Sequence, residues 1–389
     1  MTEAVITSAV RTPVGTARKG TLTETPAEDL ATHILTEAIR RSGLTAERFD
    51  DVILAESMYG GGDLARYAAV ASGLTRLPGQ AVNRHCAGSL TTVGNAAANI
   101  RAGMDRAVVA GGVESSSLSP RNTWRIPGSD ETQTRIPPTF PYTATATDDV
   151  SLTVGWNVAQ KYRISRERMD AWAVRSHARA IAAIDAGKFD DEIAPIKVTR
   201  KDGTVTEFAV DEHPRRGTSL EKVAALKPLH PKIDGFSITA GNACGANDGA
   251  AALALVADDL VREAGLTALG TVRAWAAVGV DPALTGVGAI DAIVKVLDRA
   301  RLSISDVHLW EINEAFASVP VAACQELGID EDLVNVHGSG CSLGHAVAAT
   351  GGRMLTTLTH ELRRRGGGIG VAAMCAGGGQ GGAVVVEVS

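Results

Sequence analysis

The first candidate for chemistry in this chain of 389 residues is the thiol of Cys86. It follows a strand-like segment at 80–84 and precedes a run of small residues whose apolar positions have helical spacing. A thiol at a helix N-terminus lies near free amide groups and the positive end of the helix dipole, which favours the nucleophilic thiolate. The pattern predicts a nucleophile at Cys86, with a plain buried cysteine as the alternative.

Two further side chains could assist such a thiol. His345 lies in the small-residue loop 338–352, where a histidine could take a thiol proton or, in the alternative reading, be a neutral, hydrogen-bonded loop residue. Cys375 ends an apolar strand and enters the turn CAGGGQGG, whose backbone amides could point at one centre, as an oxyanion site requires. Phosphate binding is the rival interpretation of this turn, but the signature GxxxxGKS or GxxxxGKT is absent.

Asn313 and Glu314 interrupt the apolar passage WEINEAFA. Buried amides and carboxylates need hydrogen-bond partners, so this pair is either a structural tie or part of a site. The sequence contains no HExxH, no CxxC and no cluster of carboxylates. We therefore expect no metal site.

Composition limits the class of protein. Hydrophobic residues make up 45% and charged residues 21% of the chain, as in ordinary globular proteins. There are 38 basic and 44 acidic residues, giving a net charge of −6 without a basic block, so we expect no nucleic-acid partner. No apolar window is long enough to cross a membrane, and Glu3 stands where a signal peptide carries positive charge. Five scattered cysteines predict free thiols and a cytoplasmic protein.

The first part of the chain alternates strand and helix patterns, which indicates an α/β fold. Strand-like runs occupy residues 4–10, 51–55 and 106–110. The first helix is predicted to begin with Thr25 as N-cap, Pro26 as its first residue and Glu28 completing a capping box, and to stop at Gly43.

The last part of the chain repeats this alternation. Strands are predicted at residues 270–280, 334–337, 369–375 and 383–388, and a helix is predicted from an apolar stripe at Ile290, Ile293, Val294 and Leu297. The segments VNRHCAGSL and VNVHGSGCSL resemble each other, which suggests a duplication. Between the halves, prolines, charged helices and polar turns indicate an inserted loop domain, which carries either ligand contacts or an oligomerisation arm.

Eight segments share their order with one known family: VITSAVRTPVG, NRHCAGSL, AGGVESSS, DEHPRRGTSLEKVAALKP, TAGNACGANDGAAAL, EINEAFA, LGHAVAATGGR and CAGGGQGGA. The chain resembles the thiolases, the CoA-dependent acyltransferases that form or cleave 3-ketoacyl-CoA. The resemblance implies a five-layered αβαβα fold of two duplicated halves. It places one half at 1–115, completed by 248–268, a loop domain with CoA contacts at 116–247, and the second half at 269–389. A homodimer or homotetramer is also implied.

The resemblance further implies roles for individual residues. Cys86 would accept the acyl group, His345 would act as base, Cys375 as the second acid or base, and Asn313 would hold a water. The amides of Cys86 and Gly377 would form an oxyanion hole. CoA and acyl-CoA would be substrates, with no tightly bound cofactor. The residues expected to contact CoA are Arg215, Ala240, Cys244 and Phe316.

Three departures from the family pattern keep two other functions open. Gly88 and Ser89 stand in swapped order after the nucleophile, Ala346 replaces the proline after the histidine, and Cys244 replaces a serine. A non-catalytic protein that binds acyl-CoA or lipid is one alternative. A condensing enzyme that uses acyl carrier protein is the other, although such enzymes generally lack the second cysteine.

Overall fold

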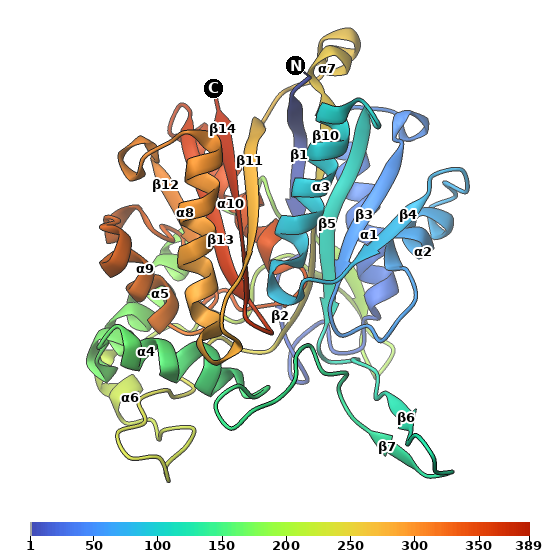
Figure 1. Cartoon of the computed structure of the whole chain (residues 1–389). Helices are drawn as coiled ribbons and strands as arrows, with labels where there is room; N and C mark the ends of the chain where they lie inside the picture. The colour runs from blue at the N-terminus through green and yellow to red at the C-terminus, as the bar shows by residue number, and fades with distance from the viewer. Residues whose placement is uncertain (1) are drawn as a thin grey trace.

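The computed structural model describes residues 2–389 and is organised around a mixed sheet of ten strands (Figure 1). In spatial order its path is β12 (Leu309–Ile312), β13 (Gly368–Ala376), β14 (Gln380–Val388), β11 (Gly270–Gly279), β1 (Ala4–Arg11), β10 (Asn247–Ala257), β5 (Ala107–Ser115), β3 (Asp51–Glu56) and β4 (Gly79–Val82). The short β2 (Gly15–Thr16) pairs with β10.

The sheet consists of two halves joined by a narrow seam. Across the seam, β1 and β11 share only the pairs Val5 with Thr271 and Ile6 with Gly270. From β1 outward the pairings run antiparallel to β10, antiparallel to β5 and parallel to β3. From β11 outward they run antiparallel to β14, antiparallel to β13 and parallel to β12. The same sequence of pairings on both sides is the structural form of the predicted duplication.

Helices complete a five-layered arrangement, in which each half of the sheet lies between an outer and a central layer of helices. The central layer holds α3 (Gly88–Ala102) and α10 (Thr350–Arg364), each of which contacts strands of both halves. On the outer faces, α1 (Ala27–Ser42) and α2 (Leu64–Ala71) cover the first half, while α8 (Gly288–Ala300) covers the second, with α9 (Ser318–Leu327) beside it. The small α7 (Asp258–Ala264) follows β10.

Small residues in α3 are explained by its central position. A helix between two sheets is buried on nearly every side, so its spacing to each sheet is set by side-chain size. A Cβ on Gly94 would lie 2.3 Å from the ring of Trp275 on β11. The glycine therefore lets the helix approach the second half of the sheet.

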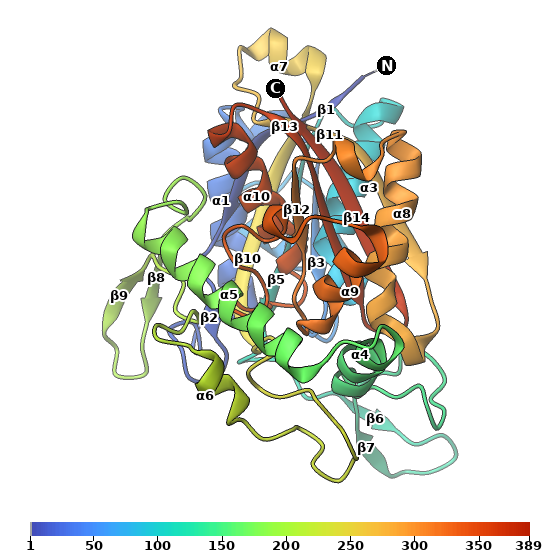
Figure 2. The ribbon, with the colours of Figure 1, turned by 90° about the vertical axis from the view of Figure 1, so that its left-hand side faces the viewer.

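The segment between the halves forms an outlying group of short elements (Figure 2). They are β6 (Thr123–Arg125), β7 (Thr132–Thr134), α4 (Asn157–Lys161), α5 (Arg166–Asp185), β8 (Ile196–Thr199), β9 (Val205–Phe208) and α6 (Leu220–Ala224). Buried Arg11 on β1 binds Glu192 at 2.6 Å and Asp211 at 2.8 Å, which anchors this segment to the first half. Within residues 2–389, none of the helices combines the length and apolar character that crossing a bilayer requires.

Three local expectations were wrong. Residues 334–337 form no strand, since Val334 makes only an isolated bridge with Trp310 and the chain turns until α10 begins. The N-cap of α1 is Pro26, without a side-chain hydrogen bond, so the capping box is not formed. Val294 on α8 is 53% exposed because it lies at the edge of the apolar stripe rather than within it. The predicted stop at Gly43 is confirmed, with a left-handed φ of 75°.

Candidate active site

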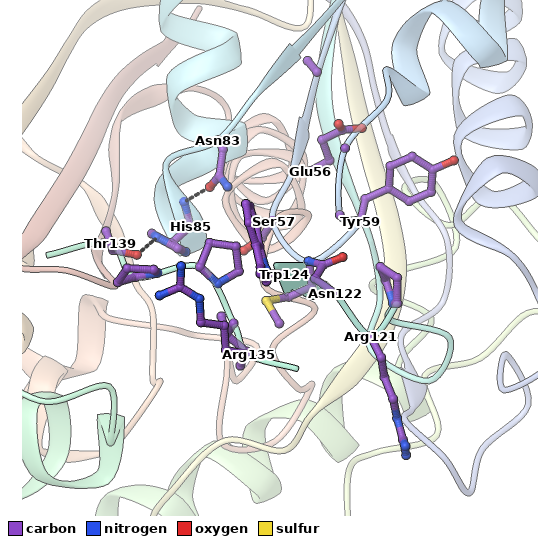
Figure 3. A pocket seen from close by; sticks show the side chains of 18 of the residues that line it. Glu56, Ser57, Tyr59, Asn83, His85, Arg121, Asn122, Trp124, Arg135 and Thr139 are labelled. Carbon is purple, nitrogen blue, oxygen red and sulfur yellow. Dashed lines mark hydrogen bonds between the residues drawn. The ribbon is translucent and has the colours of Figure 1, made fainter. Parts of the chain in front are cut away.

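Cys86 lies in a tight turn between the end of β4 and the start of α3. The turn is a single 3-10 element, His85–Ala87, and α3 begins at Gly88. His85 has a φ of 44°, which costs a non-glycine residue about 1–2 kcal/mol. Its amide donates to Asn83 Oδ1 at 2.9 Å, and its Nε2 lies 2.8 Å from Thr139 Oγ1 (Figure 3). A strained turn held from both sides therefore presents the thiol, at the helix N-terminus that the sequence predicts.

Two backbone amides act on the Cys86 thiol by favouring its ionised form. Burial raises the pKa of Cys86 to about 11, against the lowering effect of hydrogen bonds from the amides of Gly377 and of Cys86 itself. The charge of Glu114 raises this pKa further. The resting side chain is therefore a neutral thiol that needs a base before it can attack.

His345 is held in the form that can act as that base. Its Nδ1 lies 2.8 Å from Thr350 Oγ1, and this hydroxyl donates its own proton to the carbonyl oxygen of Ala346 at 2.8 Å. The hydroxyl can then only accept from Nδ1, so Nδ1 carries the ring proton and Nε2 has a free lone pair. Burial, followed by the charge of Arg353, lowers the pKa of His345 to about 4, which keeps the ring neutral.

The side-chain amide of Asn313 lies beside the imidazole of His345. Its Nδ2 lies 3.5 Å from His345 Nε2. Its Oδ1 is buried and has no hydrogen-bond partner among residues 2–389. Buried amide oxygens are almost always paired, so this atom marks a place for a water or a ligand.

The carboxylate beside it, Glu314, is a structural hub. It accepts hydrogen bonds from Trp172 Nε1 at 2.9 Å, Ser176 Oγ at 2.6 Å, Asn335 Nδ2 at 2.9 Å and the amide of Cys341 at 3.1 Å. These bonds tie α5 of the inserted segment to the loop that leads to His345. Glu314 is therefore a structural tie, whereas the part of Asn313 in a site stays a prediction.

Cys375 lies at the end of β13 with 1% of its surface exposed. Burial raises its pKa well above the usual range, and the charges of Cys86 and Cys244 add to the effect, so the three sulfur atoms are near neighbours. The turn after it requires glycine, because Gly378 and Gly379 have φ values of 82° and 74°. This turn places the Gly377 amide over Cys86.

Three of the four residues expected to contact CoA line one cavity. Arg215, Ala240 and Cys244 border a volume of about 380 Å³, together with Lys222 and with Arg216, which forms an ion pair with Asp185 outside the cavity lining. Phe316 is buried and forms an isolated bridge with Ala243, next to the cavity wall. Burial raises the pKa of Cys244 to about 12, and the charge of Cys86 also raises it. The cationic cavity therefore ends close to the nucleophile.

Two contacts explain how Gly88 and Ser89, whose order is swapped relative to the family pattern, fit the fold. A Cβ on Gly88 would lie 2.7 Å from the Cβ of Ala55, so the glycine allows α3 to approach β3. Ser89 is fully buried, and its Oγ accepts the Gly352 amide of α10 at 2.8 Å. Sequence reasoning missed these contacts, and also Thr350, because nothing in their local patterns distinguishes them from ordinary helix residues.

Cys86 lies beside the second thiol, Cys375, and the neutral imidazole of His345 lies beside the amide of Asn313. The loops that carry the two pairs meet where Ser89 Oγ accepts the Gly352 amide, and together the pairs provide the components of an acyl-transfer site on a duplicated α/β fold. Within residues 2–389, no group of three or more His, Cys, Asp or Glu side chains is arranged to hold a metal ion. Family models also identify this class of protein. The thiolase N-terminal domain matches residues 4–259, and the thiolase C-terminal domain matches residues 266–388. The chain belongs to the thiolase family, and the resemblance and the fold predicted from the motifs are confirmed.

Individual relatives match over their whole length. An acetyl-CoA acetyltransferase of Cupriavidus necator is 38% identical, with 100% of both chains covered. A 3-ketoacyl-CoA thiolase of Bacillus subtilis is 37% identical, again with 100% of both chains covered. The crystal structure of human mitochondrial 3-ketoacyl-CoA thiolase in complex with CoA has a TM-score of 0.90 and 33% identity, covering 100% of this chain and 98% of that one.

Proposed function

We propose that this protein is a CoA-dependent acyltransferase that cleaves 3-ketoacyl-CoA with CoA, or condenses acetyl-CoA with acyl-CoA, through an acyl group on Cys86. The observation that carries the proposal is two pairs of groups on adjoining loops. Cys375 and the Gly377 amide lie beside the Cys86 thiol, and the unprotonated Nε2 of His345 lies 3.5 Å from Asn313 Nδ2, whose partner atom Oδ1 is unpaired among residues 2–389. The two relatives named above support the same reaction class.

In the first half-reaction, the proton of Cys86 passes to His345 Nε2 and the thiolate attacks the keto carbon of 3-ketoacyl-CoA. The tetrahedral oxyanion lies between the amides of Cys86 and Gly377, each contributing about 3–4 kcal/mol to stabilising the transition state. Its collapse breaks the bond between the second and third carbons. The acyl group stays on Cys86, and the electron pair leaves as the enolate of acetyl-CoA.

The enolate is then protonated. Its thioester oxygen accepts hydrogen bonds from protonated His345 and from a water held by Asn313, while its carbon takes the proton of Cys375. Cys375 becomes a thiolate at this moment, although burial raises its pKa. It regains a proton when CoA enters, because the CoA thiol loses one as it attacks the acyl group on Cys86. The bond between the acyl carbon and Cys86 then breaks, and the released Cys86 thiolate takes its proton back from His345. In the condensing direction the same residues act in reverse order.

We assign the cationic cavity to CoA. Arg215, Arg216 and Lys222 suit the phosphates of the nucleotide, and Cys244 and Ala240 suit the pantetheine arm that leads to Cys86. CoA in complex with the human relative supports this assignment. CoA enters and leaves as substrate, and no tightly bound cofactor takes part.

We also propose a homodimer, or a homotetramer built from it, through the free edge of the sheet at β4. This strand has no partner on its outer side within residues 2–389, and an unpaired edge strand favours association. A cavity of about 870 Å³ lies beside it, lined by Asn83 and His85 and by hairpin residues such as Trp124 and Arg135 (Figure 3). Light scattering after gel filtration tests the assembly. The cytoplasmic location expected from the free thiols stays a prediction.

The test of function is the mass of the intact protein after incubation with acetyl-CoA, followed by peptide mapping. A single acetyl group on Cys86 that is discharged by added CoA supports the proposal, with Cys86→Ser as control. A folded protein that binds acetyl-CoA without becoming acetylated contradicts it and favours the binding-protein alternative. Acylation from acyl carrier protein but not from CoA favours the condensing-enzyme alternative.

A further inference from the structure

Glu114, which the sequence analysis left outside the site, holds the loop that follows His345. It is the penultimate residue of β5, with 3% of its surface exposed. Its Oε2 accepts a hydrogen bond from the Ala348 amide at 3.2 Å. Two residues earlier on β5, a Cβ on Gly112 would lie 2.0 Å from the Ala348 carbonyl oxygen. Strand β5 of the first half therefore contacts both the amide and the carbonyl group of Ala348 in the second half.

The restraint on Ala348 bears on His345 through a short chain of bonds. The carbonyl of Ala346 accepts the Thr350 hydroxyl, which in turn accepts the proton of His345 Nδ1. Residues 345–350 thus form one turn around the imidazole. Ala346 occupies the place where the family has a proline, so no proline ring fixes the φ angle of this residue. The conformation of the loop therefore depends more on contacts such as the one between Glu114 and Ala348.

Glu114 also acts on the nucleophile. Among residues 2–389 it forms no ion pair, and its charge is one of the causes that raise the pKa of Cys86. Burial raises the pKa of Glu114 itself to about 7, with the Ala348 amide opposing this and the charge of Asp248 on β10 adding to it. A carboxylate and a thiolate that repel each other do not ionise independently.

Several other titratable groups lie around the pair. His85 precedes Cys86 in the chain, and burial lowers its pKa and so favours the neutral ring. The Asp248 carboxylate is bound by Ser117, through its amide at 2.9 Å and through its hydroxyl. On the far side of Cys86, burial keeps the thiols of Cys375 and Cys244 neutral by raising their pKa values. The neutral ring of His345 adds no charge at rest.

We propose that Glu114 is a positioning residue that couples the two halves of the site: its carboxyl group holds the loop that carries His345, and from that position its negative charge opposes ionisation of the Cys86 thiol. The first role rests on the proposed function, because it concerns the base. The second does not, because thiol ionisation is measurable without turnover.

The sign of the coupling follows from the charges. An ionised Glu114 opposes the Cys86 thiolate by repulsion, and a protonated Glu114 does not. Glu114→Gln keeps an oxygen that can accept the Ala348 amide and removes the charge at every pH. This variant should therefore form the thiolate more readily than the unmodified protein at pH 8.

The experiment is the rate of Cys86 alkylation by iodoacetamide from pH 6 to 10, located by peptide mapping, with Cys86→Ser to identify the signal. We expect Glu114→Gln to react about threefold faster at pH 8, which corresponds to a thiol pKa lower by about half a unit. Glu56→Gln is the matched control, since Glu56 also ends a strand, accepts one backbone amide, from Leu64 at 3.1 Å, and has a pKa raised by burial. An unchanged or slower rate in Glu114→Gln, or an equal gain in Glu56→Gln, overturns the coupling.

Unmodified protein provides a second test if Glu114→Gln does not fold. Coupled ionisation displaces the line of log rate against pH downward by about half a log unit as Glu114 ionises around pH 7, whereas a single unbroken line of unit slope across this range overturns the proposal. For the loop, Glu114→Ala should lower kcat for acetyl transfer about tenfold with little change in KM, and Glu114→Gln should restore most of it. Equal losses in both variants overturn the positioning role. If no variant, nor the unmodified protein, accepts acetyl from acetyl-CoA, the proposed function fails while the alkylation profile still decides the coupling.

Discussion

The hydroxyl of Thr350 provides the sharpest test of how His345 works. In Thr350→Val the shape of the side chain is nearly kept, but His345 Nδ1 loses the acceptor that now lies 2.8 Å away. The ring then has a buried N–H without a partner, or moves its proton to Nε2, where it can no longer accept one from Cys86. Both results slow the acylation of Cys86.

The size of the effect follows from the charge that develops on the ring. A hydrogen bond to a charged group contributes about 1.5–3 kcal/mol, and His345 becomes an imidazolium as it takes the thiol proton. Losing that bond should slow acylation by about 10- to 100-fold. The fold itself should change little, since the substitution leaves one buried methyl group in place of a hydroxyl.

The assay is the rate of single-turnover acetylation of Cys86 by acetyl-CoA, quenched and read by mass. Thr356→Val is a matched control on the same helix, because the Thr356 hydroxyl is buried without a partner and its loss should leave the rate unchanged. Thr350→Ser keeps the hydroxyl and should retain most of the rate. Acylation of Thr350→Val within about twofold of the unmodified protein would refute the role given to Thr350 and the assignment of the proton to Nδ1.

Three further predictions concern other parts of the molecule. Burial raises the pKa of Glu361, but hydrogen bonds from His337 and two arginines outweigh it and hold the pKa well below its usual range. Its stabilising effect is therefore full above about pH 4.5 and declines as pH falls toward the lowered pKa. Glu361→Gln should lower Tm at pH 7, by an amount that shrinks progressively as the pH is lowered below about 4.5. Cys244→Ser supplies a stronger hydrogen-bonding group to the CoA cavity and should lower KM for CoA at unchanged kcat, as steady-state kinetics will show. Gly344 has a φ of 99°, and a Cβ there would lie 2.5 Å from the Asn247 amide, so Gly344→Ala should lower both Tm and the acylation rate.

Elements with a strong periodic pattern could be predicted from the sequence. Strands β1, β3 and β13 lie within a few residues of their expected bounds, because β-branched or apolar runs bounded by polar turns have few alternatives. Strand β10 was not predicted as a strand. Its segment, Asn247–Ala257, is rich in alanine, which does not favour strands, and only burial between β1 and β5 makes it one.

The candidate site was predictable in its residue types but not in its geometry. The expected positions of Cys86, His345, Cys375 and Asn313 came from motifs, and the structure places Cys375 beside Cys86 and Asn313 beside His345. The proton on His345 Nδ1 depends on Thr350, and no sequence motif marks the role of this threonine. Contacts between residues far apart in the chain are decided by packing, which local patterns do not contain.

The altered turns illustrate how the two halves share the site. The nucleophile comes from the first half, and the base comes from the second. At the junction, Ser89 binds the Gly352 amide and Glu114 binds the Ala348 amide, so both turns that depart from the family pattern are fixed by a contact to the opposite half. A changed residue order after the nucleophile is therefore compatible with activity as long as a hydroxyl reaches α10. It follows that the spacing between the halves, rather than the local sequence of either turn, sets the distance between thiol and imidazole.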